Sequence, residues 1–195
     1  MAKQTSHSRA LPHQKVCSVA LLTLLLSLVC IGAIPSQLEA VTIRVPTNFP
    51  TIQGAINAAV DGDTVLVAPG TYVENINFNG KAITVTSEQG PEVTIIDGNK
   101  ITAVVVFNSG EGLTSALSGF AIRNGATAVF PSLPYGGGVY LQGSSPTIVG
   151  NRITNNDATI GGGIYVYAGS PLIQGNRIEN NRSFAGFGGG IAVLN

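Results

Sequence analysis

The sequence predicts an all-β solenoid, a parallel β-helix, because short apolar runs recur every 25 to 27 residues. Residues 145–156, SPTIVGNRITNN, return 25 positions later as SPLIQGNRIENN, residues 170–181. A second element begins with three glycines and occurs three times, as GGGVYLQ from Gly136, GGGIYVY from Gly161 and GGGIAVL from Gly188. Units of this length cannot bury an apolar face alone, so they become stable by stacking on one another.

Within each repeat the apolar runs are too short for helices and alternate as strands do. In IYVY, residues 164–167, Ile164 and Val166 fall on one face and the two tyrosines on the other. In IVGNRI, residues 148–153, the alternation breaks at Gly150 and Asn151, two residue types that tolerate the left-handed conformation of a bend. Three short strands separated by such bends make one coil of a parallel β-helix.

Asparagines recur at the same places in the repeats. Stacked coils place equivalent residues about 4.8 Å apart, the spacing of neighbouring strands. The superposed pairs are Asn151 on Asn176, Asn155 on Asn180 and Asn156 on Asn181. Columns of amides can hydrogen-bond from coil to coil, as they do in other stacked β-structures. We therefore expect these asparagines to form a structural ladder and to have no catalytic role.

The region before the repeats predicts further strands and one helix. Strand-like runs separated by Gly-containing turns lie at residues 65–67, 83–85, 93–96 and 104–106. The segment TIQGAINAAVDGD differs, because its apolar residues Ile52, Ala55, Ile56 and Ala59 have helical spacing. A short amphipathic helix there would close the N-terminal end of the stack and cover its core.

The first 40 residues predict a signal peptide. Basic residues precede an uncharged apolar run from Val16 to Ile34, and Ala40 ends a polar stretch that suits cleavage. The run is long enough that an uncleaved membrane anchor stays open as an alternative. We expect residues 1–40 to be the leader and residues 41–195 the β-helix domain. The mature protein would then be secreted, extracellular or in the cell envelope, with no membrane association after cleavage.

The predicted leader contains both histidines and both cysteines of the chain. A mature part without imidazole or thiol excludes Ser-His-Asp and Cys-His catalysis, His/Cys zinc sites and disulfides. Removing the leader's three basic residues and one acidic residue from the ten of each leaves seven and nine, so the domain is weakly acidic. It lacks the basic footprint of a nucleic-acid binder, and we expect no nucleic-acid partner.

We expect no cofactor, although calcium remains possible. Asp61, Asp63 and Asp97 are the carboxylates that could touch a calcium ion. Asp61 and Asp97 stand in Asp-Gly pairs, which are far more often turns than metal ligands. No metal site is identified.

The stretch FPTIQGAINAAVDGDTVLVAPGTYVENI, followed by KAITVTSEQGPEVTIIDGN, resembles the N-terminal region of pectin-lyase-like β-helix proteins, pectin methylesterases among them. The downstream GNRITNN and GGGIYV units are similar to the repeats of secreted parallel β-helix proteins. The resemblance covers nearly all of residues 42–195 and implies right-handed coils. The catalytic motifs of pectin methylesterases, polygalacturonases and pectate lyases are absent from the sequence, so the resemblance transfers no catalytic residue.

One outward column of the predicted coils is aromatic. Tyr140 lies over Tyr165, with Tyr167 beside them. Aromatic faces on a flat β-surface can hold sugar rings; the alternative is cross-strand pairing that stabilises the sheet.

A second outward column is basic, with Arg152 over Arg177. Like charges this close repel one another unless an anion lies between them, so a uronate or sulfate could bridge the pair. The alternative is two solvated arginines neutralised by nearby Glu179.

The leading hypothesis is a secreted parallel β-helix protein that binds extracellular polysaccharide and has no clear catalytic residues. Two alternatives stay open: a polysaccharide lyase or glycoside hydrolase acting on uronate-containing glycans, and a structural surface or adhesin module. The last strand-like unit stops at Asn195 without a capping segment. We therefore expect a chain that is incomplete at its C-terminus or, alternatively, an end-to-end self-association surface.

Overall fold

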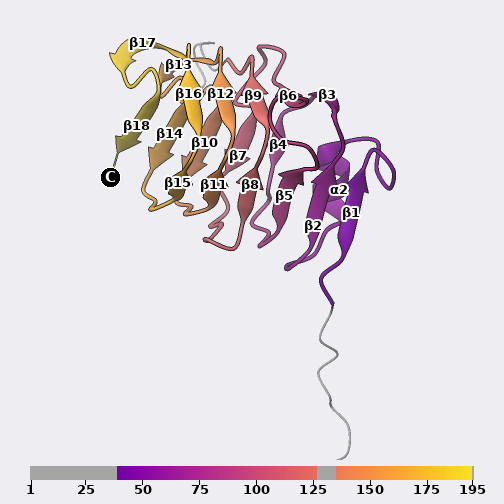
Figure 1. The fold of residues 1–195 in the computed structure, drawn as a ribbon. Coiled ribbons are helices and arrows are strands. Elements are labelled where there is room, and N and C mark those ends of the chain that lie inside the picture. The colour runs from indigo at the N-terminus through magenta and orange to yellow at the C-terminus, as the bar shows by residue number, and fades with distance from the viewer. Residues whose placement is uncertain (1–38, 127–134, 195) are drawn as a thin grey trace, which may run out of the picture. The chain divides into compact units, whose positions relative to one another are not determined.

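Short strands stack into three long parallel sheets and one two-stranded sheet in the computed structural model, which describes residues 39–126 and 135–194. The described residues belong to one unit of the chain, Glu39–Asn195. Nearly all of the predicted signal peptide therefore lies outside the described residues, and its cleavage stays a prediction. Figure 1 shows the strands as successive layers from the indigo end to the yellow end of the unit.

Each complete coil gives one strand to each of the three long sheets, and the first strand of the chain adds a sixth strand to sheet A. Sheet A contains β1 (Thr42–Val45), β2 (Thr64–Val67), β5 (Thr84–Ser87), β8 (Ala116–Ser118), β11 (Thr147–Val149) and β15 (Leu172–Gln174). Sheet B contains β3 (Gly70–Val73), β6 (Thr94–Asp97), β9 (Ala121–Arg123), β12 (Arg152–Thr154) and β16 (Arg177–Glu179). Sheet C contains β4 (Ile76–Asn77), β7 (Val105–Phe107), β10 (Val139–Gln142), β14 (Ile164–Tyr167) and β18 (Ile191–Leu194). Sheet D pairs β13 (Asp157–Ile160) with β17 (Arg182–Phe187).

From β2 onward the chain visits sheets A, B and C in turn and then starts the next coil. Hydrogen-bonded neighbours are therefore not consecutive strands, apart from β1 and β2, which a helix separates. All of these strand pairs are parallel, and the two regular repeats align as predicted, with Ile148 beside Ile173 and Ile153 beside Ile178. The prediction of an all-β parallel β-helix is confirmed.

The core consists of apolar columns that run through the stack. Along β10 and β14, Val139, Leu141 and Ile164 are fully buried, as the alternation predicted. The Phe78 and Phe107 rings pack in the centre with their centroids 4.2 Å apart. Burying such aromatic side chains supplies much of the stabilisation of a small core.

Helix α2 (Ile52–Ala58) is the predicted N-terminal helix, and it buries Ile52, Ala55 and Ile56 against the first coils. Charged side chains hold both of its ends. The Glu74 carboxylate accepts hydrogen bonds of 2.9 Å from the first backbone N–H groups of the helix. The Lys81 ammonium donates bonds of 2.7 Å to three carbonyls at its C-terminus. Both charges complement the helix dipole, so the helix is fixed as a lid on the stack.

Two asparagine columns connect the coils at their bends. The Asn176 side-chain oxygen accepts from the backbone N–H of Asn151 at 2.9 Å and from its side-chain amide at 3.1 Å. The Asn151 side chain repeats this pattern one coil earlier, accepting from Phe120 N–H at 3.0 Å and donating to Leu117 C=O at 3.0 Å. Each amide therefore satisfies backbone groups of the preceding coil, which would otherwise be buried without partners.

Asn156 and Asn181 form the second column. The Asn181 oxygen accepts from the Asn156 backbone and side-chain amides, both at 3.0 Å. Asn155 and Asn180 are placed differently, which corrects the expected third ladder. Both are exposed, have φ angles of 57° and 54°, and in the described part of the chain have no side-chain hydrogen bond to one another. They provide the left-handed corner, a conformation that asparagine tolerates better than most residues.

Candidate functional site

The outer face of sheet C presents two columns of side chains. The first consists, from coil to coil, of Asn77, Val106, Tyr140, Tyr165 and Ala192. The second consists of Gln142, Tyr167 and Leu194. The predicted tyrosine column therefore exists, and the structure brings all three predicted tyrosines to one face.

The tyrosines stack on one another. The Tyr140 and Tyr165 rings are parallel within 1° with centroids 5.8 Å apart, and Tyr135 stacks on Tyr165 at 4.7 Å. Tyr165 is only 5% exposed. Because it is nearly buried, Tyr165 supports this surface and does not itself offer a face to a sugar. Burial raises the pKa of the Tyr165 hydroxyl, and the neighbouring tyrosines raise it further.

Tyr167 is the accessible tyrosine of the three, with 44% of its surface exposed. Uncharged hydrogen-bonding groups lie on the same face of sheet C. The Tyr140 hydroxyl donates to the exposed Gln142 side chain at 2.7 Å. Nearer the N-terminus, the Asn77 amide donates to the exposed Asn108 side chain at 3.2 Å. An amphipathic ring beside amide groups can contact both the C–H and the O–H groups of a carbohydrate.

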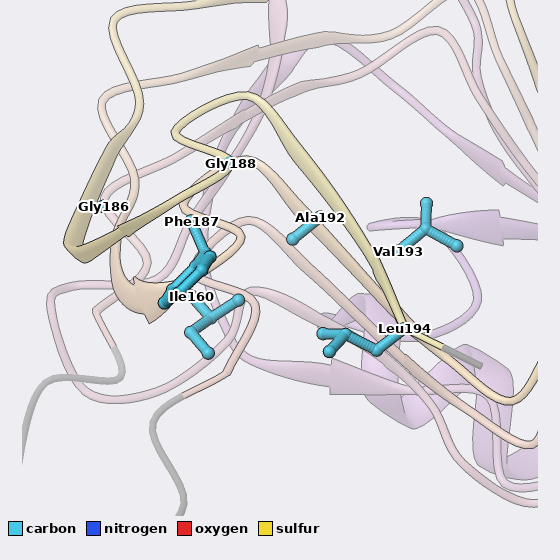
Figure 2. Close-up of a pocket in the computed structure, with 7 residues that line it drawn as sticks. All are labelled: Ile160, Gly186, Phe187, Gly188, Ala192, Val193 and Leu194. Atoms are coloured by element: carbon cyan, nitrogen blue, oxygen red, sulfur yellow. The ribbon is translucent and has the colours of Figure 1, made fainter.

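An apolar hollow of about 400 Å³ lies in the last described coil, lined by Ile160, residues 186–188 and residues 192–194. Figure 2 shows the Ile160 and Phe187 side chains lying side by side at this hollow. Ala192 holds the column position that Tyr165 holds one coil earlier, and its small side chain leaves space there. Sequence reasoning missed this hollow, although the change from GGGIYVY to GGGIAVL was its visible signal.

The predicted arginine column lies on the outer face of sheet B, away from the tyrosines. Arg152 and Arg177 are neighbours in register, and the Glu179 carboxylate accepts from both, at 3.0 and 2.9 Å. These hydrogen bonds hold the pKa of Glu179 below its ordinary value, and the bond from Arg152 has the larger effect. The anion between the two arginines is therefore the chain's own Glu179 carboxylate, the second of the two alternatives that the sequence left open.

The carboxylates of Asp63 and Asp97, which were considered for calcium, accept hydrogen bonds within the fold. Asp63 accepts from the backbone N–H groups of Val41 and Val60 at 2.8 and 2.9 Å. Asp97 accepts from Arg123 at 3.0 Å and Asn124 at 2.9 Å. Among the described residues, no three His, Cys, Asp or Glu side chains gather as metal ligands could.

Glu111 is a buried carboxylate that sequence reasoning missed. It accepts hydrogen bonds from the N–H groups of Gly80 and Ser109 and from the Ser144 hydroxyl, at 2.8, 2.9 and 2.8 Å. Burial raises the pKa of its carboxyl, but these hydrogen bonds outweigh burial and hold the pKa below its ordinary value. With its charge fully hydrogen-bonded inside the fold, Glu111 connects three coils and has a structural role.

The described residues contain no helix with the length and apolar character needed to cross a bilayer.

Comparison with known families supports this architecture. The family model described as right-handed beta helix region matches residues 56–195. The chain belongs to this right-handed β-helix family. The sequence-based resemblance to right-handed parallel β-helix proteins is thereby confirmed, and the stacked parallel sheets fit a pectin-lyase-like β-helix.

A curated protein is also similar to this β-helix chain. It is a "Cell surface glycoprotein" of Methanothermus fervidus, 28% identical over 138 residues, which are 70% of the β-helix chain. The matched part is 20% of that glycoprotein's own length. No solved structure matches the chain significantly.

Proposed function

We propose that this protein is a surface-located β-helix protein that binds extracellular polysaccharide through the outer face of sheet C. The observation that carries the proposal is the exposed Tyr167 ring, which lies beside Gln142 and on the same face as the stacked pair Tyr140 and Tyr165. The similarity to a protein named cell surface glycoprotein supports the location.

The outer face of sheet C is suited to weak, repeated contacts. Side chains that are already held by their neighbours, such as Tyr140 and Gln142, lose little conformational freedom on binding, which lowers the entropic cost of association. A polymer that contacts several coils gains avidity, because each further contact is intramolecular. The surface therefore suits a polysaccharide better than a single small sugar.

A glycan array with the full chain tests this proposal. We expect binding to at least one polysaccharide, and Tyr167→Ala should weaken it about tenfold, equivalent to about 1.4 kcal/mol. Arg177→Ala, on the outer face of sheet B, is the matched control and should leave binding unchanged. No binding to any glycan, or binding that Tyr167→Ala leaves intact, contradicts the proposal.

A further inference from the structure

The strands of sheet C carry no charge in the described part of the chain. Strands β4, β7, β10, β14 and β18 contain only apolar, tyrosine, asparagine and glutamine residues. The residues that line the apolar hollow are also uncharged. The strands that form this face, from Asn77 to Leu194, are therefore neutral.

The outer face of sheet B has the opposite character. It carries the ion pair of Arg123 with Asp97 at 3.0 Å and the pairs that Glu179 makes with both arginines. Charged side chains thus lie on the strands of sheet B and are absent from the strands of sheet C in the described residues. The acidic-glycan chemistry that the arginine column suggested belongs to sheet B, where the guanidinium groups already hold a carboxylate.

We propose that the ligand of the sheet C face is a neutral polysaccharide that lies along the stacking direction of the coils. This inference rests on the proposed function and specifies its ligand class. A uronate or sulfate brought onto this face would lose part of its hydration without meeting a cation, and that cost is not recovered. Neutral sugar hydroxyls instead find amide and phenol partners that both donate and accept.

The direction of the ligand follows from the register. Asn108, Gln142 and Tyr167 come from three successive coils, and Gln142 lies beside Tyr167 in neighbouring strands. Neighbouring strands are about 4.8 Å apart, so a chain that runs across the strands contacts each of these side chains in turn. The hollow beside Ala192 lies at the end of the same path.

Affinity electrophoresis of the full chain tests this ligand class, using soluble mannan and β-glucan as neutral probes and polygalacturonate and alginate as acidic probes. We expect retardation by at least one neutral probe, little change when salt is raised, and no retardation by the acidic probes. Tyr167→Ala and Gln142→Ala should each weaken neutral binding about tenfold. Gln142→Lys places a cation on the exposed face and should create salt-sensitive binding to the acidic probes.

The outcomes separate the two proposals. Stronger binding of the acidic probes, with steep salt dependence and loss in Tyr167→Ala, overturns the neutral class and leaves the polysaccharide site standing. Retardation by neither kind of probe overturns both. Neutral binding that survives Tyr167→Ala and Gln142→Ala overturns the assignment to sheet C. Circular dichroism of each variant shows whether its fold is retained.

Discussion

Replacing Gly137 by alanine is expected to destabilise the β-helix by roughly 3 kcal/mol, the upper end of what overpacking commonly costs. A Cβ atom at Gly137 would lie 2.6 Å from the carbonyl oxygens of both Asp157 and Gly162. Both are backbone atoms. Gly137 also donates to Gly161 at 3.2 Å and accepts from Val104 at 3.1 Å, so moving it away breaks bonds between coils. Gly137, the middle residue of the first three-glycine run, is therefore required for the close approach of neighbouring coils.

Urea unfolding followed by circular dichroism measures this effect, with Gly112→Ala as the control. No atom lies within 4 Å of a Cβ at Gly112, and its φ is not in the left-handed region. We expect Gly112→Ala to change stability by less than about 0.5 kcal/mol, as surface substitutions usually do. Equal unfolding midpoints for the two variants would show that the coils can separate at Gly137 without cost.

The regular repeats could be predicted because equal spacing preserves register. A step of 25 residues brings Arg152 beside Arg177 and, one sheet further on, Tyr140 beside Tyr165. The same reasoning could not reach Glu111, whose bonds to Gly80 and Ser144 span 31 and 33 residues in irregular coils. Loop contacts of this kind depend on backbone paths that no local pattern specifies.

At the candidate site, the column of tyrosines could be predicted but their exposure could not. Alternation places Tyr140, Tyr165 and Tyr167 on one face. It does not say that Tyr165 stacks on Tyr135 and is nearly buried while Tyr167 stays open. Ring orientation depends on rotamers and on the neighbours in adjacent coils, and these are fixed only when the coils pack.

Replacing Asn156 by alanine is expected to cost roughly 3 kcal/mol, because the substitution leaves buried backbone groups without partners. The Asn156 side chain accepts from Gly125 N–H at 2.8 Å and donates to Ile122 C=O at 3.1 Å and to Asn181 at 3.0 Å. Asn156 is fully buried, so water from the solvent cannot replace the hydrogen bonds that the substitution removes. The loss should appear as a lower urea midpoint of the full chain.

Asn155→Gly is the matched control, since Asn155 is the exposed neighbour in the left-handed corner. Glycine adopts that conformation readily, so Asn155→Gly should change stability by less than about 1 kcal/mol. Asn156→Asp keeps the acceptor for Gly125. At low pH its carboxyl is protonated and keeps one donor in place of two, so the variant should then fall between the control and Asn156→Ala. If Asn155→Gly lowered stability as much as Asn156→Ala, the loss in Asn156→Ala could not be attributed to the side-chain hydrogen bonds of Asn156. The common cost would then come from disturbing the bend itself.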